Sequence, residues 1–250
     1  MAGTAPIYDR IGTTYTETRK PDARIAAQLH AALGDASTVL NVGAGTGNYE
    51  PTDRRLMALE PSMAMINQRT SDVPVVQAPA EAIPFADDSF DAVMGTFTVH
   101  HWPDRQRGLE ECRRVAERQV LIVYEPELTN QYWFFDYFTA LRSASWEQDA
   151  PTVDELAVHL DVIDVEPLWV PADCTDGFAG AFWNRPEAYL RDDVQAGMST
   201  LARLPASDRE EGANALAAAL ESGEWDRRFG HLRDEDQADL GYRLVTAGVS

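Results

Sequence analysis

Lysine, cysteine and excess positive charge are all scarce in this 250-residue chain. Lys20 is the only lysine, and 21 basic against 41 acidic residues give a net charge of −20 at pH 7. Such a surface repels phosphate groups, so we expect neither a nucleic acid nor an anionic membrane as a partner. The two cysteines, Cys112 and Cys174, are too few for a disulfide framework or a cysteine-ligated metal cluster. We expect Cys112 to be a small core residue of a helix.

Long apolar segments are missing too. No run approaches the length that crosses a membrane, and Met1 to Arg10 has no apolar signal core. These absences predict a cytoplasmic protein. No group of histidine, cysteine or acidic residues has the spacing of a metal site, so no metal is expected. The sequence does not indicate an oligomeric state. The length and the hydrophobic content of 44% suit one α/β domain with helical additions.

Three closely spaced glycines form the strongest motif. Val39 to Val42 is typical of a strand buried on both faces, and it runs directly into Gly43-Ala44-Gly45-Thr46-Gly47. Glycines let the backbone turn sharply and leave room for a ligand beside the main chain. A second strand, near Arg55 to Leu59, ends at Glu60, whose carboxylate is well placed to accept hydrogen bonds from two ribose hydroxyls. The pattern predicts a nucleoside-containing cofactor.

The glycine spacing bears on which cofactor this is. The pattern is G-x-G-x-G, whereas dinucleotide sites usually read G-x-G-x-x-G and place the pyrophosphate at a helix N-terminus. Only a short segment precedes the second strand, so a long helix there is not expected, and the loop has no basic residue for phosphates. The stretch resembles motif I of the class I S-adenosylmethionine (SAM) methyltransferases, with Glu60-Pro61-Ser62 as its acidic partner. Residues 78–91 resemble the segment before the fourth strand in the ubiquinone and menaquinone C-methyltransferase group.

The resemblance covers Val39 to Pro126 well and implies SAM as the cofactor. In many of these enzymes an acidic residue just before an Ala-Glu pair binds the adenine amino group, but Pro79 stands there in this chain. Adenine recognition is then expected from the backbone of the next two residues and from apolar packing. A guanidinium matches the carboxylate of SAM, and the N-terminal segment of related enzymes folds over the cofactor. The expected cofactor-binding residues are Tyr15, Arg19, Gly43, Ala44, Gly45, Asn48, Glu60, Pro61, Met65, Ala80, Glu81, Thr96 and Phe97.

Strands and helices alternate through the first half of the chain, which predicts an α/β fold with a doubly wound, mostly parallel seven-stranded sheet of Rossmann-like type. The resemblance implies an antiparallel seventh strand beside the sixth, with helical insertions over the carboxyl ends of the strands. We expect a single domain over residues 1–250. Its parts are an N-terminal cap over the cofactor (1–37), a SAM-binding core (38–126) and two helical substrate-lid insertions (127–160 and 178–238). The predicted later elements are helices over 21–33, 62–69 and 104–118 and strands over 73–76, 90–99, 119–124, 162–170 and 241–245.

A pair of histidines follows the predicted fourth strand, where a methyl acceptor would approach. A catalytic base is needed only if the acceptor must lose a proton, and histidine titrates in the useful range. Because side chains alternate along a strand, only one of the two is expected to face the site. We favour His101 over His100 as the base. The alternative is that the pair only packs or orients a loop.

Aromatic residues are concentrated in the predicted insertions. Trp133, Tyr137 and Trp183 are the candidate substrate-binding residues, although aromatic residues at helical spacing are also typical of an ordinary core. An apolar pocket with few polar groups suits a small, largely hydrophobic organic acceptor, and analogy places such enzymes in bacterial secondary metabolism. No motif identifies oxygen, nitrogen or carbon as the methylated atom.

Three other functions fit parts of the same pattern. A SAM-binding enzyme can use the cofactor's charge for non-methylating chemistry such as cyclisation or decarboxylation. A non-enzymatic protein can use the cofactor to gate binding, and an NAD-dependent oxidoreductase shares the nucleoside site. Formation of S-adenosylhomocysteine distinguishes methyl transfer from all three.

Overall fold

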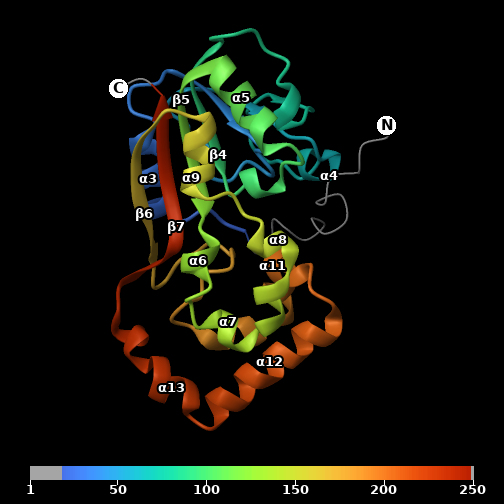
Figure 1. The fold of residues 1–250 in the computed structure, drawn as a ribbon, viewed down its shortest axis with the longest axis vertical. Coiled ribbons are helices and arrows are strands. Elements are labelled where there is room, and N and C mark those ends of the chain that lie inside the picture. The colour runs from blue at the N-terminus through green and yellow to red at the C-terminus, as the bar shows by residue number, and fades with distance from the viewer. Residues whose placement is uncertain (1–18, 249–250) are drawn as a thin grey trace.

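The computed structural model describes residues 19–248, which form one twisted sheet with helices on both faces and a helical cluster at one end (Figure 1). The strand order is β3-β2-β1-β4-β5-β7-β6, and β7 runs antiparallel between β5 and β6 while the pairs from β3 to β5 are parallel. The predicted fold class and the antiparallel last strand beside the sixth are therefore confirmed. The strands are β1 (Thr38–Val42), β2 (Arg55–Leu59), β3 (Val75–Val76), β4 (Phe90–Thr96), β5 (Ala116–Tyr124), β6 (Val162–Pro171) and β7 (Gln237–Gly248).

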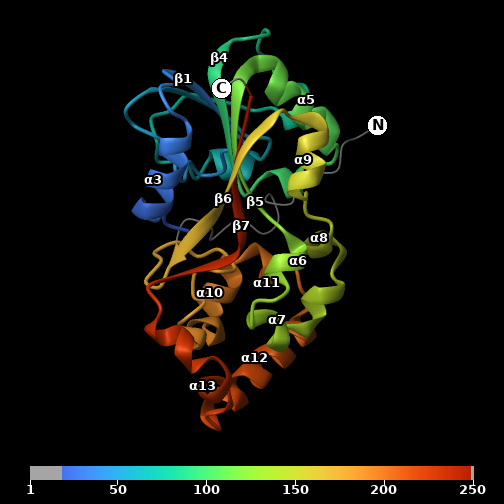
Figure 2. The same cartoon turned by 60° about the vertical axis from the view of Figure 1, so that its left-hand side comes forward.

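Alternating residues of the central strands pack into two separate hydrophobic cores, one on each face of the sheet. Val39 of β1 packs in the core under α3 (Ala23–Ala32), whereas its neighbour Leu40 packs in the core under α5 (Arg105–Val115) and α9 (Val153–His159). Figure 2 shows α3 on one side of the sheet and α5 and α9 on the other. Burial on both faces explains why β1 is apolar at consecutive positions. Cys112 lies on α5 and is fully buried, as predicted.

Capping residues set the ends of α3. The side chain of Asp22 accepts a hydrogen bond from the backbone N–H of Arg24 (2.9 Å), and Gly34 follows the helix with φ +59°. The helix predicted over 21–33 is thus confirmed. The helix predicted over 104–118 ends earlier, at Val115, because β5 already begins at Ala116. The helix predicted over 62–69 is reduced to α4 (Met63–Ile66).

The fourth strand is also shorter than predicted. It ends at Thr96, because Phe97 adopts a left-handed backbone conformation (φ 53°) that extended structure does not allow. Val99 to His101 then forms the 3₁₀ turn η3 (Val99–His101). The expectation of alternating sides for the two histidines is therefore wrong, since they do not lie on a strand. The absence of a helix between β1 and β2 in the structure agrees with the spacing argument.

Apart from β6 and β7, helices make up most of the second half of the chain, and all but α12 are short. Except for α9, they gather at the end of the sheet where β5 continues into α6, and the segment between β6 and β7 returns to the same end (Figures 1 and 2). Among the residues described, no helix is long and apolar enough to cross a membrane. The remaining elements are η2 (Ala80–Ala82), α6 (Pro126–Thr129), α7 (Phe134–Tyr137), η4 (Thr139–Ser143), α8 (Ser145–Gln148), η5 (Pro186–Leu190), α10 (Asp192–Gly197), α11 (Ser199–Ala202), α12 (Ala206–Glu221), α13 (Glu224–Phe229) and η6 (Gly230–Asp234).

Candidate active site

The glycine loop after β1 borders a cavity of about 340 Å³. Gly43 and Gly45 both have positive φ (68° and 53°), and a Cβ on Gly43 would overlap the hydroxyl of Thr98. The loop backbone therefore stays bare beside the cavity. Six of the predicted cofactor-binding residues meet in this wall, together with three that the sequence did not single out. The wall consists of Arg19, Asn41, Gly43, Ala44, Gly45, Thr46, Asn48, Tyr49 and Thr96.

Glu60 follows β2 and joins the same loop. One carboxylate oxygen accepts a hydrogen bond from the backbone N–H of Gly45 (2.8 Å), and the other accepts one from Ser62 (2.8 Å). The carboxylate therefore lies beside the glycine loop at the end of β2, where a carboxylate is placed to accept hydrogen bonds from ribose hydroxyls. Met65 on α4 is buried against the loop, with its terminal methyl 3.4 Å from the place where a Cβ of Gly45 would lie.

The polar atoms around this cavity fit an adenosyl group with an amino acid tail. The hydroxyl of Thr96 lines the cavity and is buried without a hydrogen-bond partner in the structure. A buried hydroxyl of this kind is normally paired, so its position beside a cavity points to a polar ligand. Other polar groups nearby include the amide of Asn48 and the carboxylate of Glu60. Because these groups are neutral or negatively charged, they suit the hydroxyl and amino groups of a nucleoside better than a pyrophosphate.

Arg19 has a partner other than the one predicted. Its guanidinium forms a two-point ion pair with Asp176, with Nε–Oδ1 and Nη2–Oδ2 distances of 2.6 and 3.1 Å, and the hydroxyl of Tyr49 donates to the same carboxylate (2.7 Å). All three groups are buried. The guanidinium predicted to meet the carboxylate of SAM is thus engaged by Asp176, a residue that sequence reasoning missed. Asp176 lies 157 residues after Arg19, so no local sequence pattern indicates that the two residues pair.

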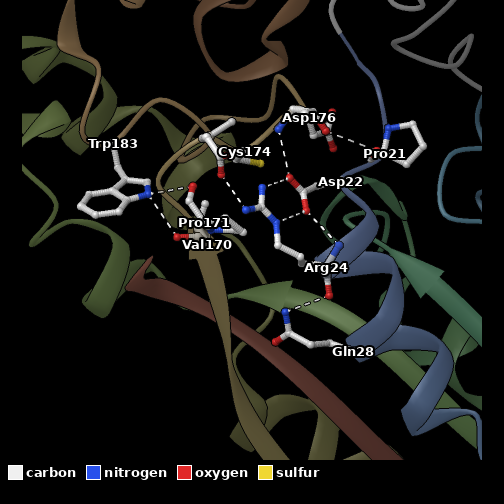
Figure 3. Close-up of polar contacts among 12 residues, drawn as sticks. Pro21, Asp22, Arg24, Gln28, Val170, Pro171, Cys174, Asp176 and Trp183 are labelled. Atoms are coloured by element: carbon white, nitrogen blue, oxygen red, sulfur yellow. Dashed lines mark hydrogen bonds and ion pairs between the residues drawn. The ribbon is translucent and has the colours of Figure 1, made fainter. Parts of the chain in front are cut away.

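The segment that carries Asp176 is tied to the start of α3. Asp22 accepts a hydrogen bond from the backbone N–H of Thr175 (3.1 Å) while its carboxylate also binds Arg24, and these hydrogen bonds hold the pKa of Asp22 far below its ordinary value. Figure 3 shows this contact between the helix and the loop after β6. The exposed Asp173 pairs with the same arginine (2.6 Å). The N-terminal helix and the loop after β6 therefore form one edge of the site.

Besides Glu60, Met65 and Phe97, three described residues that were predicted to bind the cofactor are not part of the cavity wall. The backbone carbonyl of Pro61 accepts a hydrogen bond from Gln77 (3.2 Å), Ala80 is buried in η2, and the carboxylate of Glu81 accepts one from the backbone of Asp104 (3.1 Å). Their contact with a cofactor stays a prediction. Tyr15 lies outside the described residues.

A second cavity, of about 770 Å³, adjoins the first and shares Arg19 with it. Phe97, which was predicted to bind the cofactor, lies instead in this second wall, where its ring contacts those of Phe178 and Tyr242 at centroid distances of 5.1 and 5.4 Å. Rings and aliphatic groups predominate in the wall, with a few charged and hydroxyl groups between them. The wall consists of Arg19, Phe97, His100, His101, Tyr124, Thr129, Tyr132, Phe135, Trp146, Glu147, Phe178, Ala179, Ser199, Thr200, Arg203, Leu240 and Tyr242.

Both histidines line the second cavity, with ring centroids 3.9 Å apart. Burial, together with the nearby Arg203 and Arg19, lowers the pKa of His101 to about 3. Burial, together with His101 and two arginines, also holds the pKa of His100 well below its ordinary value. The two rings are therefore neutral at pH 7. A group with a pKa near 3 is a weak base, because a useful base has a pKa near the operating pH.

The predicted substrate-binding aromatic residues are core residues and not wall residues of this cavity. The indole N–H of Trp133 donates to the carbonyl of Trp183 (2.7 Å), and the indole of Trp183 donates to the carbonyls of Val170 and Pro171 (3.1 and 3.2 Å; Figure 3). Tyr137 is buried in the same core. The wall uses neighbours such as Tyr132 and Phe135 instead, since short helices expose different faces than a long helix would.

Known proteins match both the core and the whole chain. A family model described as a methyltransferase domain matches residues 40–124. A solved structure from Anabaena variabilis, assigned as a methyltransferase from an antibiotic biosynthesis pathway, is 30% identical with a TM-score of 0.85, and the match covers 95% of this chain and 100% of that one. The chain is 29% identical over 145 residues to 2-methyl-6-phytyl-1,4-hydroquinone methyltransferase 2 of Oryza sativa, covering 53% of this chain and 41% of that protein. It is 33% identical over 94 residues to the demethylmenaquinone methyltransferase of Thermotoga maritima, covering 34% and 41%.

The matches to these two curated relatives span less than half of their length. The likeness to the Anabaena protein, in contrast, extends over nearly the whole chain, and the family model falls on the glycine loop and the strands beside it. The chain therefore belongs to the class I SAM-dependent methyltransferases.

Proposed function

We propose that this protein transfers the methyl group of SAM to a small, largely hydrophobic organic acceptor bound in the second cavity. The observation that carries the proposal is a pair of cavities of different chemistry that share Arg19 in their walls. One is bounded by the glycine loop and polar side chains, and the other is bounded mainly by aromatic rings.

The cofactor cavity binds and orients the donor in this proposal. When bound, SAM supplies an activated methyl group on a positively charged sulfur. Glu60 accepts hydrogen bonds from the ribose hydroxyls beside the glycine loop, and Thr96 offers its hydroxyl to the same ligand. The ion pair of Arg19 with Asp176 holds the wall between donor and acceptor, so that the two reactants keep a fixed geometry.

The second cavity excludes water and holds the acceptor. Its aromatic wall suits an apolar molecule, and the neutral rings of His100 and His101 orient the acceptor without removing a proton. The rice relative acts on a hydroquinone with a phytyl chain, which supports an apolar acceptor. The Anabaena relative's assignment to antibiotic biosynthesis supports a role in bacterial secondary metabolism.

Two measurements test the proposal. Calorimetry is expected to detect binding of S-adenosylhomocysteine, and incubation with SAM and a panel of alkylated phenols, hydroquinones and amines is expected to form S-adenosylhomocysteine only when an acceptor is present. His101→Ala is expected to leave S-adenosylhomocysteine affinity nearly unchanged while slowing turnover. A wild-type protein that binds no S-adenosylhomocysteine contradicts the proposal.

A further inference from the structure

Glu147 is an unusual member of the acceptor-cavity wall. It lies on α8, its exposed fraction is 6%, and it borders the cavity between aromatic neighbours. Among the residues that the structure describes, none donates a hydrogen bond to its carboxylate or forms an ion pair with it. Buried carboxylates are normally paired because an isolated buried charge is costly. An unpaired carboxylate beside a cavity is thus poised for a group on the ligand.

Burial leaves the carboxyl of Glu147 able to take up a proton near neutral pH. Burial raises the pKa of Glu147 to about 7, and Arg203, at the end of α11, opposes the rise. Arg203 stands 4.7 Å over the ring of Trp146, the residue next to Glu147. The other titratable or charged groups that face the same cavity are Arg19 before α3, His100 and His101 on η3, Tyr124 on β5, Tyr132 before α7 and Tyr242 on β7.

We propose that Glu147 accepts the proton of a phenolic hydroxyl on the methyl acceptor, so that the substrates of this enzyme are phenols or hydroquinones. The proposal rests on the proposed function and names the substrate class of that same cavity. The aromatic wall receives the ring of the acceptor, and the carboxylate receives its O–H. Neither histidine is suited to this task, because burial and nearby arginines hold the pKa of both rings low and so make them weak bases.

The proton and electrons balance in this step. The O–H bond breaks and its proton moves to the carboxylate of Glu147. The electron pair of the oxygen, or of a ring carbon conjugated with it, forms a bond to the methyl carbon. The carbon–sulfur bond breaks and its electron pair stays on sulfur, which becomes neutral. When oxygen is methylated, Glu147 releases its proton to water after product leaves. When a ring carbon is methylated, that carbon loses its hydrogen as a proton to water and Glu147 returns its own proton to the ring oxygen.

The charges near Glu147 favour a phenol over an ammonium ion. An alkylamine is cationic at pH 7. Ionised Glu147 would attract its charge, but Arg203 and the positively charged sulfur of the donor would both repel it, while Asp176 already offsets the charge of Arg19. A phenol is neutral when it enters the cavity, and its O–H can donate the hydrogen bond that the carboxylate of Glu147 lacks. The cavity therefore discriminates by charge as well as by shape.

Binding of three probes to the full chain tests the inference without knowledge of the natural acceptor. With S-adenosylhomocysteine bound, calorimetry measures the affinities of 4-tert-butylphenol, its methyl ether and 4-tert-butylbenzylamine in wild type and in Glu147→Gln. Wild type is expected to bind the phenol roughly tenfold or more tightly than the ether, the range of a hydrogen bond to a charged group. Glu147→Gln is expected to lose most of that preference.

The pH dependence separates proton acceptance from a packing role. In wild type the preference for the phenol is expected to rise with pH through about 7 as the carboxylate ionises, whereas in Glu147→Gln it stays flat. Glu127→Gln, an exposed change on the neighbouring helix α6, is the matched control and is expected to behave like wild type. Equal binding of phenol and ether by wild type, no phenol binding, tighter amine binding, or an unchanged preference in Glu147→Gln each overturns the inference. Failure to bind S-adenosylhomocysteine overturns the proposed function instead.

Discussion

Glu147→Gln should change the pH dependence of folding stability, independently of any ligand. The carboxyl has a pKa of about 7 in the folded protein against an ordinary value of 4.5. Below pH 4.5 it is protonated in both states and has no effect. Between pH 4.5 and 7 the folded state keeps its proton while the unfolded state loses it, so wild-type stability falls as pH rises. At 1.36 kcal/mol for each unit of pKa, the loss reaches about 3 kcal/mol above pH 7.

Glutamine does not titrate, so the variant escapes this loss. The difference in unfolding free energy between Glu147→Gln and wild type should therefore move by about 3 kcal/mol in favour of the variant between pH 4.5 and pH 8. Urea unfolding at several pH values measures it, with equal m-values as the condition for comparison. Titration of the buried histidines is common to both proteins and cancels in the difference.

A difference that stays constant across this range would refute the reasoning, because it would mean that the carboxyl is solvated or paired in the folded protein. Glu127→Gln, an exposed change on α6, provides the baseline. The sign is as informative as the size. If the variant instead lost stability relative to wild type as the pH rises, the ionised carboxylate of Glu147 would have a favourable partner in the folded protein.

Three further changes test the cofactor side of the site. Glu60→Ala removes the acceptor for two backbone N–H groups and for the ribose, and calorimetry should find S-adenosylhomocysteine affinity weakened by about 1.5 to 3 kcal/mol; unchanged affinity would exclude the ribose role. Gly43 has a positive φ, and Gly43→Ala adds a Cβ that overlaps the side chain of Thr98. Both thermal stability and S-adenosylhomocysteine binding should therefore fall. Asp176→Asn leaves the guanidinium of Arg19 buried without its counter-charge and should cost about 3 to 5 kcal/mol in urea unfolding, whereas the exposed Asp173→Asn should cost less than about 1 kcal/mol.

The parts of the site that sequence predicts are those encoded by neighbouring residues. The bare loop at Gly43 to Gly47 and the acidic residue after β2 are local patterns, and parallel pairing of β1 with β2 brings them together. Apolar runs likewise predict the central strands. The end of β4 escaped prediction because the left-handed turn at Phe97 is made by a residue type that rarely adopts it.

The acceptor cavity could not be predicted in the same way. Its wall joins Glu147, Arg203 and Tyr242 from three elements separated by many residues, and their meeting depends on how short helices pack. An aromatic pattern does not distinguish a core face from a cavity face, so Trp133 was assigned to the wall while Tyr132 beside it actually lines it.

The buried contact among Arg19, Tyr49 and Asp176 joins three stretches of chain that otherwise belong to different parts of the fold. The segment between β6 and β7 is consequently not an interchangeable module. A chimera that imports this segment from a relative must also import a carboxylate at its start, or else leave a cation stranded next to the glycine loop. Recombination between homologues should therefore succeed at junctions after this acidic position, and at junctions before it only when the imported segment carries a carboxylate there.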